Sequence, residues 1–159
     1  MKESLLNVVL FQPQIPHNTG AVGRTCVGVG AKLWIVRPCA FQFSDKNLKR
    51  AGLDYWPYLE WEMVDSWDDL LTKLPQTERY FFYTKFAQNS YLDQKYQPGD
   101  TLVFGCETTG LPDEFRVRYA DQCVRIPICD EARCLNLSVS VGVAAFEAIR
   151  QIRSADSDF

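Results

Sequence analysis

The chain contains a single histidine, His17, among its 159 residues. Ser-His-Asp and Cys-His nucleophilic systems would all have to use that one side chain, which argues against hydrolases of either kind. No two of the six cysteines stand in a C-x-x-C pair, so the spacing supports neither a zinc site nor a disulfide framework. We therefore expect reduced thiols, most of them buried.

Long apolar runs and a strong excess of charge are also missing. No window approaches the roughly 20 apolar residues of a membrane span, and residues 1–4 lead into no targeting segment, so we expect a soluble cytoplasmic protein. The formal net charge is −3, so any contact with nucleic acid must come from local clusters or from an oligomer that gathers them. A length of 159 residues with 47% hydrophobic content suits one domain, residues 1–159, without internal repeats.

Short apolar runs of strand length alternate with helical patterns. We expect strands at residues 5–11, 32–36, 62–64, 79–83, 101–104 and 123–126, and helices at residues 21–29, 67–74, 113–119 and after residue 138. Nearly continuous apolar strands are typical of a parallel sheet covered on both faces. The prediction is an α/β fold with a mostly parallel sheet flanked by helices, whose ligand sites lie beyond the C-terminal ends of the strands.

Several residues mark the ends and faces of these helices. Gly30 should end the first helix, because glycine tolerates left-handed geometry, and Ser66 should cap the second. Asn136 and Ser138 are residues that cap helix starts, and they precede the last helix. In that helix, the i, i+3/i+4 spacing predicts one buried face formed by Val139, Val143, Phe146 and Ile149.

Three polar loops follow predicted strands, at residues 18–24, at 83–85 together with 105–110, and at 126–138. Asn18, Thr19, Gly20 and Arg24 could hold an anion or a sugar-phosphate, although the first three could equally serve only to cap and turn. The loop with Gly105, Glu107 and Gly110 lacks the Gly-Lys-Ser/Thr of a Walker loop and the G-x-G-x-x-G spacing, so it is either a ligand loop or a tight turn.

A basic helical face is expected where Lys46, Lys49 and Arg50 fall at i, i+3 and i+4. Such a face is either solvated surface or a phosphate-binding surface.

Four ordered segments resemble a known family. They are Pro-Gln-Ile-Pro-His-Asn-Thr-Gly-Ala-Val-Gly-Arg24, Lys-Arg-Ala-Gly-Leu-Asp-Tyr55, Val-Phe-Gly-Cys-Glu-Thr-Thr-Gly-Leu-Pro112 and Arg-Ile-Pro-Ile through Leu-Asn-Leu-Ser138. Together they are similar to the SPOUT-class RNA 2'-O-methyltransferases, over roughly residues 7–151. Within that class the chain most resembles the small tRNA (cytidine/uridine-2'-O-)-methyltransferases of the wobble nucleotide in leucine tRNAs.

The resemblance implies an α/β knot, in which the C-terminal stretch threads a loop to form a trefoil that binds S-adenosylmethionine. It places the cofactor against Tyr83, Thr84, Gly105, Glu107, Ile126, Cys134, Leu135 and Ser138. Cys134 stands where the family usually has serine, a change that keeps the size of the side chain but weakens its hydrogen bond. The chain also departs from the family at Tyr83, where methionine or a small aliphatic residue is commoner.

The same resemblance puts Arg24 at the ribose, with Asn18, Glu107, Asn136 and Ser138 shaping the catalytic site. Because a guanidinium stays protonated, we expect Arg24 to stabilise the developing alkoxide rather than to act as a base. The family needs no metal and completes its site from two subunits, so we expect a homodimer that binds tRNA, with Lys46, Lys49 and Arg50 as RNA contacts.

The sequence therefore predicts S-adenosylmethionine-dependent 2'-O-methylation of the wobble nucleotide, position 34, a cytidine or modified uridine, in leucine tRNAs. Two alternatives remain open. One is the same chemistry at another tRNA position or on rRNA, and the other is a non-catalytic RNA-binding module on the same fold.

Overall fold

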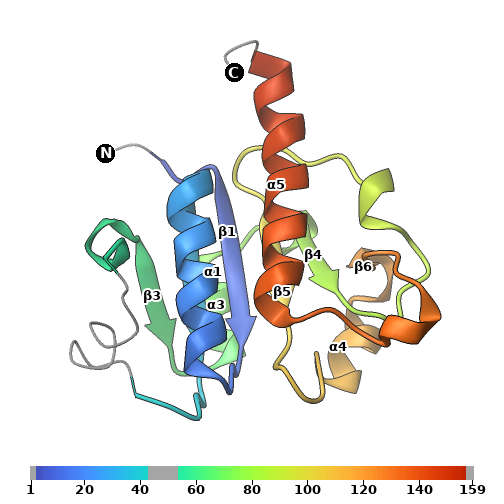
Figure 1. Ribbon diagram of the computed structural model, residues 1–159, viewed down its shortest axis with the longest axis horizontal. Coiled ribbons are helices and arrows are strands. Elements are labelled where there is room, and N and C mark those ends of the chain that lie inside the picture. The colour runs from blue at the N-terminus through green and yellow to red at the C-terminus, as the bar shows by residue number, and fades with distance from the viewer. Residues whose placement is uncertain (1–2, 43–53, 157–159) are drawn as a thin grey trace.

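The structure, a computed structural model, describes residues 3–42 and 54–156. Within these ranges six strands form one sheet in the order β3-β2-β1-β5-β4-β6, and all neighbours pair in parallel (Figure 1). The strands are β1 (Leu6–Phe11), β2 (Ala31–Val36), β3 (Trp61–Val64), β4 (Tyr80–Tyr83), β5 (Thr101–Phe104) and β6 (Cys123–Val124). The predicted α/β fold with a parallel sheet is confirmed.

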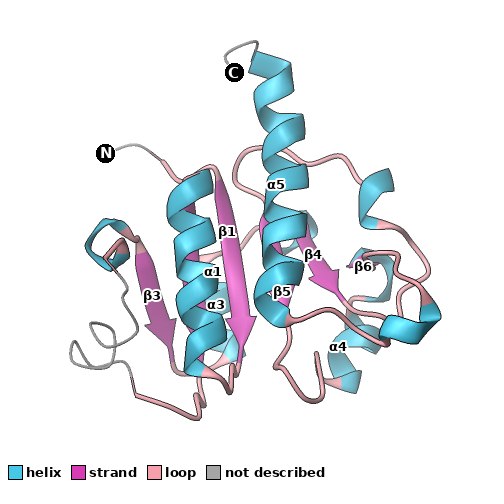
Figure 2. Cartoon of the chain, viewed as in Figure 1, coloured by secondary structure: helices cyan, strands magenta, loops and turns pink. Residues whose placement is uncertain are grey.

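Helices cover both faces of this sheet. They are α1 (Pro16–Val29), α3 (Trp67–Lys73), α4 (Asp113–Arg118) and α5 (Leu137–Asp156), and 3-10 turns lie at Trp56–Tyr58, Thr77–Arg79, Tyr91–Asp93, Ala120–Gln122 and Asp130–Ala132. Figure 2 shows α1 and α5 side by side in front of the sheet, with α3 and α4 behind it. Two hydrophobic clusters correspond to these layers, one built with α1 and α5 and the other with α3 and α4.

Two helix ends are as predicted. Gly30 has a φ of 75° and donates its backbone N–H to the Cys26 carbonyl, which ends α1. The Ser66 hydroxyl accepts from the Asp69 backbone N–H at 3.1 Å, which caps α3. These signals are local, so the sequence alone was enough to predict them.

The start of α1 differs from its prediction. The helix was expected at residues 21–29, but it begins at Pro16, so Asn18, Thr19 and Gly20 are helical and buried rather than parts of a loop. Proline suits the first helical position, because its fixed φ matches the helix and its missing N–H would have been unpaired there. This correction puts Asn18 in the first turn of α1.

The buried face of α5 also differs. Val139 and Phe146 are 50% and 59% exposed, and of the four predicted residues only Ile149 is fully buried. The residues that face the core are Val141, Ala144, Ala145, Ala148, Ile149 and Ile152. The alanines let α5 lie close to α1 and the sheet, whereas Val139 and Phe146 are turned outward.

Other predictions need smaller corrections. The last strand, expected at 123–126, ends at Val124, because the backbone of Arg125 pairs with Asn89 and Tyr91 of a loop beyond β4. All six cysteines are free, but only Cys26 and Cys123 are buried. No helix in the described parts of the chain is long and apolar enough to span a bilayer. The predicted basic face of Lys46, Lys49 and Arg50 falls outside the described residues.

Candidate functional site

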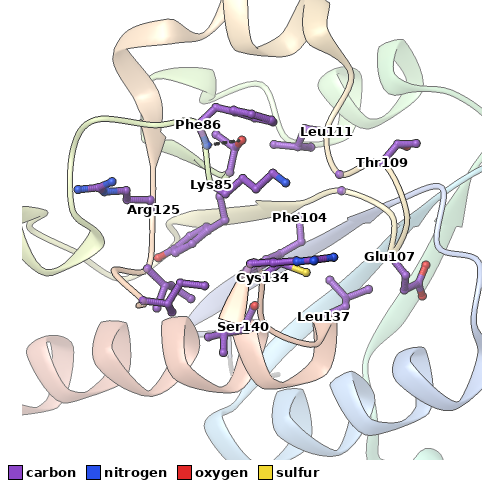
Figure 3. A pocket seen from close by; sticks show the side chains of 18 of the residues that line it. Lys85, Phe86, Phe104, Glu107, Thr109, Leu111, Arg125, Cys134, Leu137 and Ser140 are labelled. Carbon is purple, nitrogen blue, oxygen red and sulfur yellow. Dashed lines mark hydrogen bonds between the residues drawn. The ribbon is translucent and has the colours of Figure 1, made fainter. Parts of the chain in front are cut away.

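A cavity of ≈ 600 Å³ lies beyond the C-terminal ends of β4, β5 and β6. It is lined by the loops that follow these strands and by the start of α5. Seven of the residues that the sequence assigned to the cofactor line it, namely Tyr83, Thr84, Gly105, Glu107, Ile126, Cys134 and Leu135. In Figure 3, Cys134, Leu137 and Ser140 lie on the side of α5, while Lys85, Phe86 and Leu111 lie on the opposite side. Segments far apart in the sequence therefore share one cavity.

Four predicted site residues lie elsewhere. Asn18, Arg24, Asn136 and Ser138 are not among the residues that line the cavity. Conversely, the cavity is also lined by residues that the sequence did not assign to the cofactor, including Lys85, Phe86, Leu111, Pro127, Arg133 and Ser140. Lys85, Pro127 and Arg133 lie inside the predicted polar loops 83–85 and 126–138, whereas Phe86, Leu111 and Ser140 lie one or two positions beyond a predicted loop.

Glu107 joins two loops. Its carboxylate accepts the backbone N–H of Gln14 at 2.7 Å and that of Ile15 at 3.0 Å. In return, the Gln14 side-chain oxygen accepts from the Thr108 hydroxyl at 2.8 Å and from its backbone N–H at 3.3 Å. Ile15 is the N-cap residue of α1 and has no side-chain cap, so the carboxylate supplies the negative charge that a helix start favours. Glu107 thus ties the loop after β5 to the start of α1.

Gly105 lies where two stretches of backbone nearly touch. A Cβ at this position would be 2.1 Å from the carbonyl carbon of Gly110 and 2.2 Å from the backbone nitrogen of Leu111. Gly110 itself has a φ of 68° and donates its N–H to the Cys106 carbonyl at 3.1 Å. The loop can fold back on the end of β5 only because residue 105 has no side chain.

Aromatic rings form the inner wall of the cavity. Tyr83 stacks on Phe104 with ring centroids 4.7 Å apart and an interplanar angle of 15°. The Tyr83 and Tyr96 hydroxyls are 2.6 Å apart, and the Tyr96 backbone N–H donates to the Gln151 side chain of α5 at 3.0 Å. Burial, and next the neighbouring Tyr96, raise the pKa of Tyr83 well above its ordinary value, so it stays a neutral phenol. Tyr83 is larger than the residue that the family commonly has at this position, and its hydroxyl holds the ring in place.

A γ-turn shapes the loop before α5. Arg133 has φ 61° and ψ −56°, and the backbone N–H of Cys134 donates to the Ala132 carbonyl at 2.7 Å. This conformation is uncommon for a residue other than glycine, and costs of order 1–3 kcal/mol. It brings Arg133, Cys134 and Leu135 onto the cavity wall. Nothing in the sequence signals it, because no glycine or asparagine marks the turn.

Besides Cys134, the cavity is lined by Cys106 and Cys129, and the Cys106 thiol is held by hydrogen bonds. Burial alone would raise its pKa, but hydrogen bonds, first that from the Thr109 side chain, outweigh this effect and lower the pKa.

Asn136 caps α5 and links it to α1. Its side-chain oxygen accepts from the Ser138 backbone N–H at 2.9 Å and from the Ser138 hydroxyl at 2.6 Å. Its side-chain nitrogen donates to the Asn18 side-chain oxygen at 3.1 Å, across 118 positions of sequence. Asn18 is only 6% exposed, so this hydrogen bond is largely shielded from water. Asn18, Asn136 and Ser138 therefore set how the two helix starts meet.

The Arg24 side chain extends from α1 and contacts the segment before β3. Its guanidinium carbon lies 4.7 Å from the centroid of the Tyr55 ring, and a nitrogen lies 3.5 Å from the Asp54 carboxylate. The Tyr55 hydroxyl in turn donates to the Gly20 carbonyl of α1. The Arg24 and Asp54 side chains are 66% and 85% exposed, and ion pairs of this kind are worth about 0–1 kcal/mol. The guanidinium is oriented by the ring yet available to an anionic partner.

The cavity suits S-adenosylmethionine. Its volume lies within the roughly 300–1,000 Å³ of small-molecule sites. Tyr83, Phe104, Leu111, Ile126 and Leu137 offer apolar surface for an adenine ring. The charged side chains on the wall, Lys85, Arg125, Arg133, Glu107 and Asp130, include partners for both ends of an amino acid. Among the described residues, no three His, Cys, Asp or Glu side chains come close enough to hold a metal ion.

Known proteins are similar to this chain over most of its length. A protein of Listeria innocua is 45% identical over 148 residues, covering 91% of this chain and 87% of the relative. The tRNA (cytidine(34)-2'-O)-methyltransferase of Burkholderia pseudomallei is 41% identical over 149 residues, covering 92% of this chain and 96% of the relative.

Solved structures of RNA methyltransferases are also similar to this chain. One that is described as giving structural insights into the 2-OH methylation of C/U34 on tRNA has a TM-score of 0.86 and 42% identity, covering 95% of this chain and 92% of that one. The S-adenosylmethionine-bound rRNA methyltransferase of Sinorhizobium meliloti has a TM-score of 0.80 and 26% identity, covering 94% of this chain and 57% of that one. The family model for SpoU rRNA methylases matches residues 5–146. The chain therefore belongs to the SpoU rRNA methylase family, whose members transfer methyl groups from S-adenosylmethionine.

Proposed function

We propose that this protein methylates the ribose 2'-oxygen of nucleotide 34 in tRNA. The observation that carries the proposal is the cavity at the ends of β4, β5 and β6, because it gathers seven of the residues that the family resemblance assigns to the cofactor. Relatives at 41% identity over nearly the whole chain are named for this reaction. The finer specificity that we propose is for leucine tRNAs with a cytidine or a modified uridine at that position.

The cofactor supplies a methyl group already activated on a sulfonium. The residues of the protein would therefore position the two reactants and stabilise the charge that develops on the 2'-oxygen. Tyr83, Gly105 and Leu135 would hold the cofactor in the cavity. Arg24 would hold the ribose, and its charge would stabilise the 2'-oxygen as the proton leaves. In-line placement of the attacking oxygen supplies much of the acceleration in transfers of this type.

The proposed active form is a homodimer. Arg24 does not line the cavity that it is proposed to serve, which supports a site completed by a second copy. Two large apolar side chains of α5, Val139 and Phe146, are exposed, and so is Ile15 at the start of α1, at 45%. A second copy packed against this face would bury them and could bring its Arg24 to the cavity.

Replacing Phe146 with aspartate should separate the dimer, because a charge would have to be buried against apolar side chains. We expect the variant to sediment as a monomer and to lose most of its methyl transfer. The matched control is Val117→Asp on α4, on the opposite face of the sheet, where an 81% exposed side chain is changed in the same way. A wild-type protein that is monomeric at micromolar concentration would contradict the proposed dimer.

The remaining assignments follow from this function. We place the protein in the cytoplasm, where tRNA is modified, and assign residues 1–159 to a single domain. Lys46, Lys49 and Arg50 are proposed contacts to the tRNA backbone.

The test of function is tritium transfer from labelled S-adenosylmethionine onto a panel of purified tRNAs and rRNA, followed by mapping of the methylated nucleotide. We expect label at nucleotide 34 of leucine tRNAs, and the same methyl group should be missing from tRNA of a strain that lacks the protein. Label on rRNA or at another tRNA position would favour the first alternative. Cofactor binding without transfer to any RNA would favour the non-catalytic module.

A further inference from the structure

An exposed aromatic side chain flanked by cations lies at the mouth of the cavity. Phe86 is 60% exposed, and both it and Lys85 line the cavity. We propose that Phe86 is a stacking platform for an RNA base beside the nucleotide that is methylated. The inference rests on the proposed function and adds a residue that positions the substrate.

The backbone turn after β4 holds Phe86 outward. The Thr84 hydroxyl accepts from the Phe86 backbone N–H at 3.3 Å, as the dashed line in Figure 3 marks, and the Thr84 carbonyl accepts from the Ala87 backbone N–H at 3.3 Å. Ala87 is 8% exposed and packs into the cluster beneath α3 and α4. Buried Ala87 therefore anchors the turn, and the Phe86 ring stays at the surface.

Two cations hold the ring in place. The Arg116 guanidinium of α4 lies 4.1 Å from the ring centroid and also pairs with Asp113, while the Lys85 ammonium lies 5.2 Å from the centroid. The Arg116 Nε is buried and has no hydrogen-bond partner among the described residues, and the guanidinium is oriented by Asp113 and by the ring. A ring ordered before binding loses little conformational freedom when a base stacks on it.

The charged side chains around Phe86 favour a nucleic-acid base, and not an apolar protein surface, as the partner of its ring. Lys85, Arg125 and Arg133 line the cavity, and none of them forms an ion pair within the described residues. Two carboxylates, Glu107 and Asp130, also line the cavity, but that of Glu107 is engaged by the backbone N–H groups of Gln14 and Ile15. An aromatic face among cations is the arrangement by which proteins bind single-stranded nucleic acid, with bases on the ring and phosphates on the charges.

In Figure 3 the Phe86 and Leu111 side chains both lie on the side of the cavity opposite Cys134. A nucleotide whose ribose reaches the cavity would thus have a neighbouring base within reach of the ring. The ring could instead cover the adenine of the cofactor, and this second occupant predicts a different result in the test below.

The test compares Phe86→Leu, which keeps an apolar side chain of similar size, with Phe86→Tyr, which keeps the ring. For Phe86→Leu we expect the Kd for tRNA to rise about tenfold, as for the loss of one base–aromatic stack, while Phe86→Tyr binds as the wild type does. The Kd for S-adenosylmethionine should stay unchanged in both. An anticodon stem-loop carrying 2-aminopurine at the nucleotide after the methylated one should be quenched by the wild type and by Phe86→Tyr, but much less by Phe86→Leu.

Salt dependence separates stacking from charge. Plots of log Kd for tRNA against log salt should be parallel for the wild type and Phe86→Leu, whereas Lys85→Gln should lower the slope by about 0.7 if Lys85 meets a phosphate of a single strand. Unchanged tRNA binding by Phe86→Leu, or a raised Kd for the cofactor, would overturn the inference. Wild-type transfer is the separate readout of the proposed function. If it occurs and Phe86→Leu behaves normally, only the platform is wrong.

Discussion

Replacing Arg24 with alanine is expected to lower methyl transfer to tRNA by at least about a hundredfold, the usual cost of removing a group that stabilises a developing oxyanion. The Kd for S-adenosylmethionine should stay nearly unchanged, because Arg24 does not line the cavity. Tritium transfer and calorimetric titration of the cofactor measure the two quantities. Normal turnover by Arg24→Ala would remove Arg24 from the mechanism.

Two controls sharpen this result. Arg24→Lys keeps the charge but loses the planar fork, so it should recover only part of the activity. Asp54→Asn removes the exposed carboxylate 3.5 Å from the guanidinium and should change little, because such a pair contributes about 0–1 kcal/mol.

Mixing variants tests whether Arg24 acts across the proposed dimer. Copies that carry Arg24→Ala have an intact cavity, and copies that carry Gly105→Ala have an intact Arg24. If Arg24 serves the partner's cavity, random mixed dimers hold one complete site and should restore roughly a quarter of wild-type activity. If Arg24 serves its own cavity, the mixture should stay inactive, provided that sedimentation shows mixed dimers to be present.

Gly105→Ala is expected to raise the Kd for S-adenosylmethionine by more than tenfold and to lower the melting temperature. The new Cβ would lie 2.1 Å from the Gly110 carbonyl carbon and 2.5 Å from its oxygen, well inside van der Waals contact. The loop cannot simply retreat, because Leu111 is 5% exposed and Glu107 is tied to the start of α1. Overpacking of this kind costs typically about 1–3 kcal/mol, which corresponds to a loss of several °C in a domain of this size.

Gly28→Ala is the matched control for this prediction. A Cβ there meets nothing within 4 Å, and the residue is helical, so the substitution should stabilise α1 by about 0.5–1 kcal/mol and leave cofactor binding intact. Titration with the cofactor measures the Kd of both variants, and thermal unfolding measures their melting temperatures. Wild-type affinity in Gly105→Ala would show that the loop can move without harm and would contradict the close approach described here.

The confirmed predictions depended on local signals. Gly30 and Ser66 mark helix ends through their own backbone or side-chain chemistry, and the apolar runs at 5–11 and 32–36 follow from residue type. The family resemblance identified seven residues that the structure places around one cavity. Their roles remain predictions, as does the trefoil knot, because the order of strands in a sheet does not determine how the chain threads.

The features that the sequence did not predict depend on residues far apart in the chain. α1 begins five residues before its predicted start, and its N-terminus is held by Glu107, which is 92 positions from Ile15. Of the four positions predicted for the buried face of α5, only Ile149 is buried, because that face is formed with Val141, Ile152 and three alanines while Val139 and Phe146 turn outward.

The sequence by itself thus determined the strands, the glycine and serine helix ends, the family and the loops that could hold a ligand, because each depends on residue types at short spacing. Only the tertiary structure decided where α1 starts, which side of α5 is buried, that Arg133 adopts a γ-turn and that Arg24 lies outside the cavity. It also placed Phe86 at the mouth of the cavity, with Arg116 against its ring. These features arise from packing and hydrogen bonds between distant segments, and local propensity carries no information about which segments will meet.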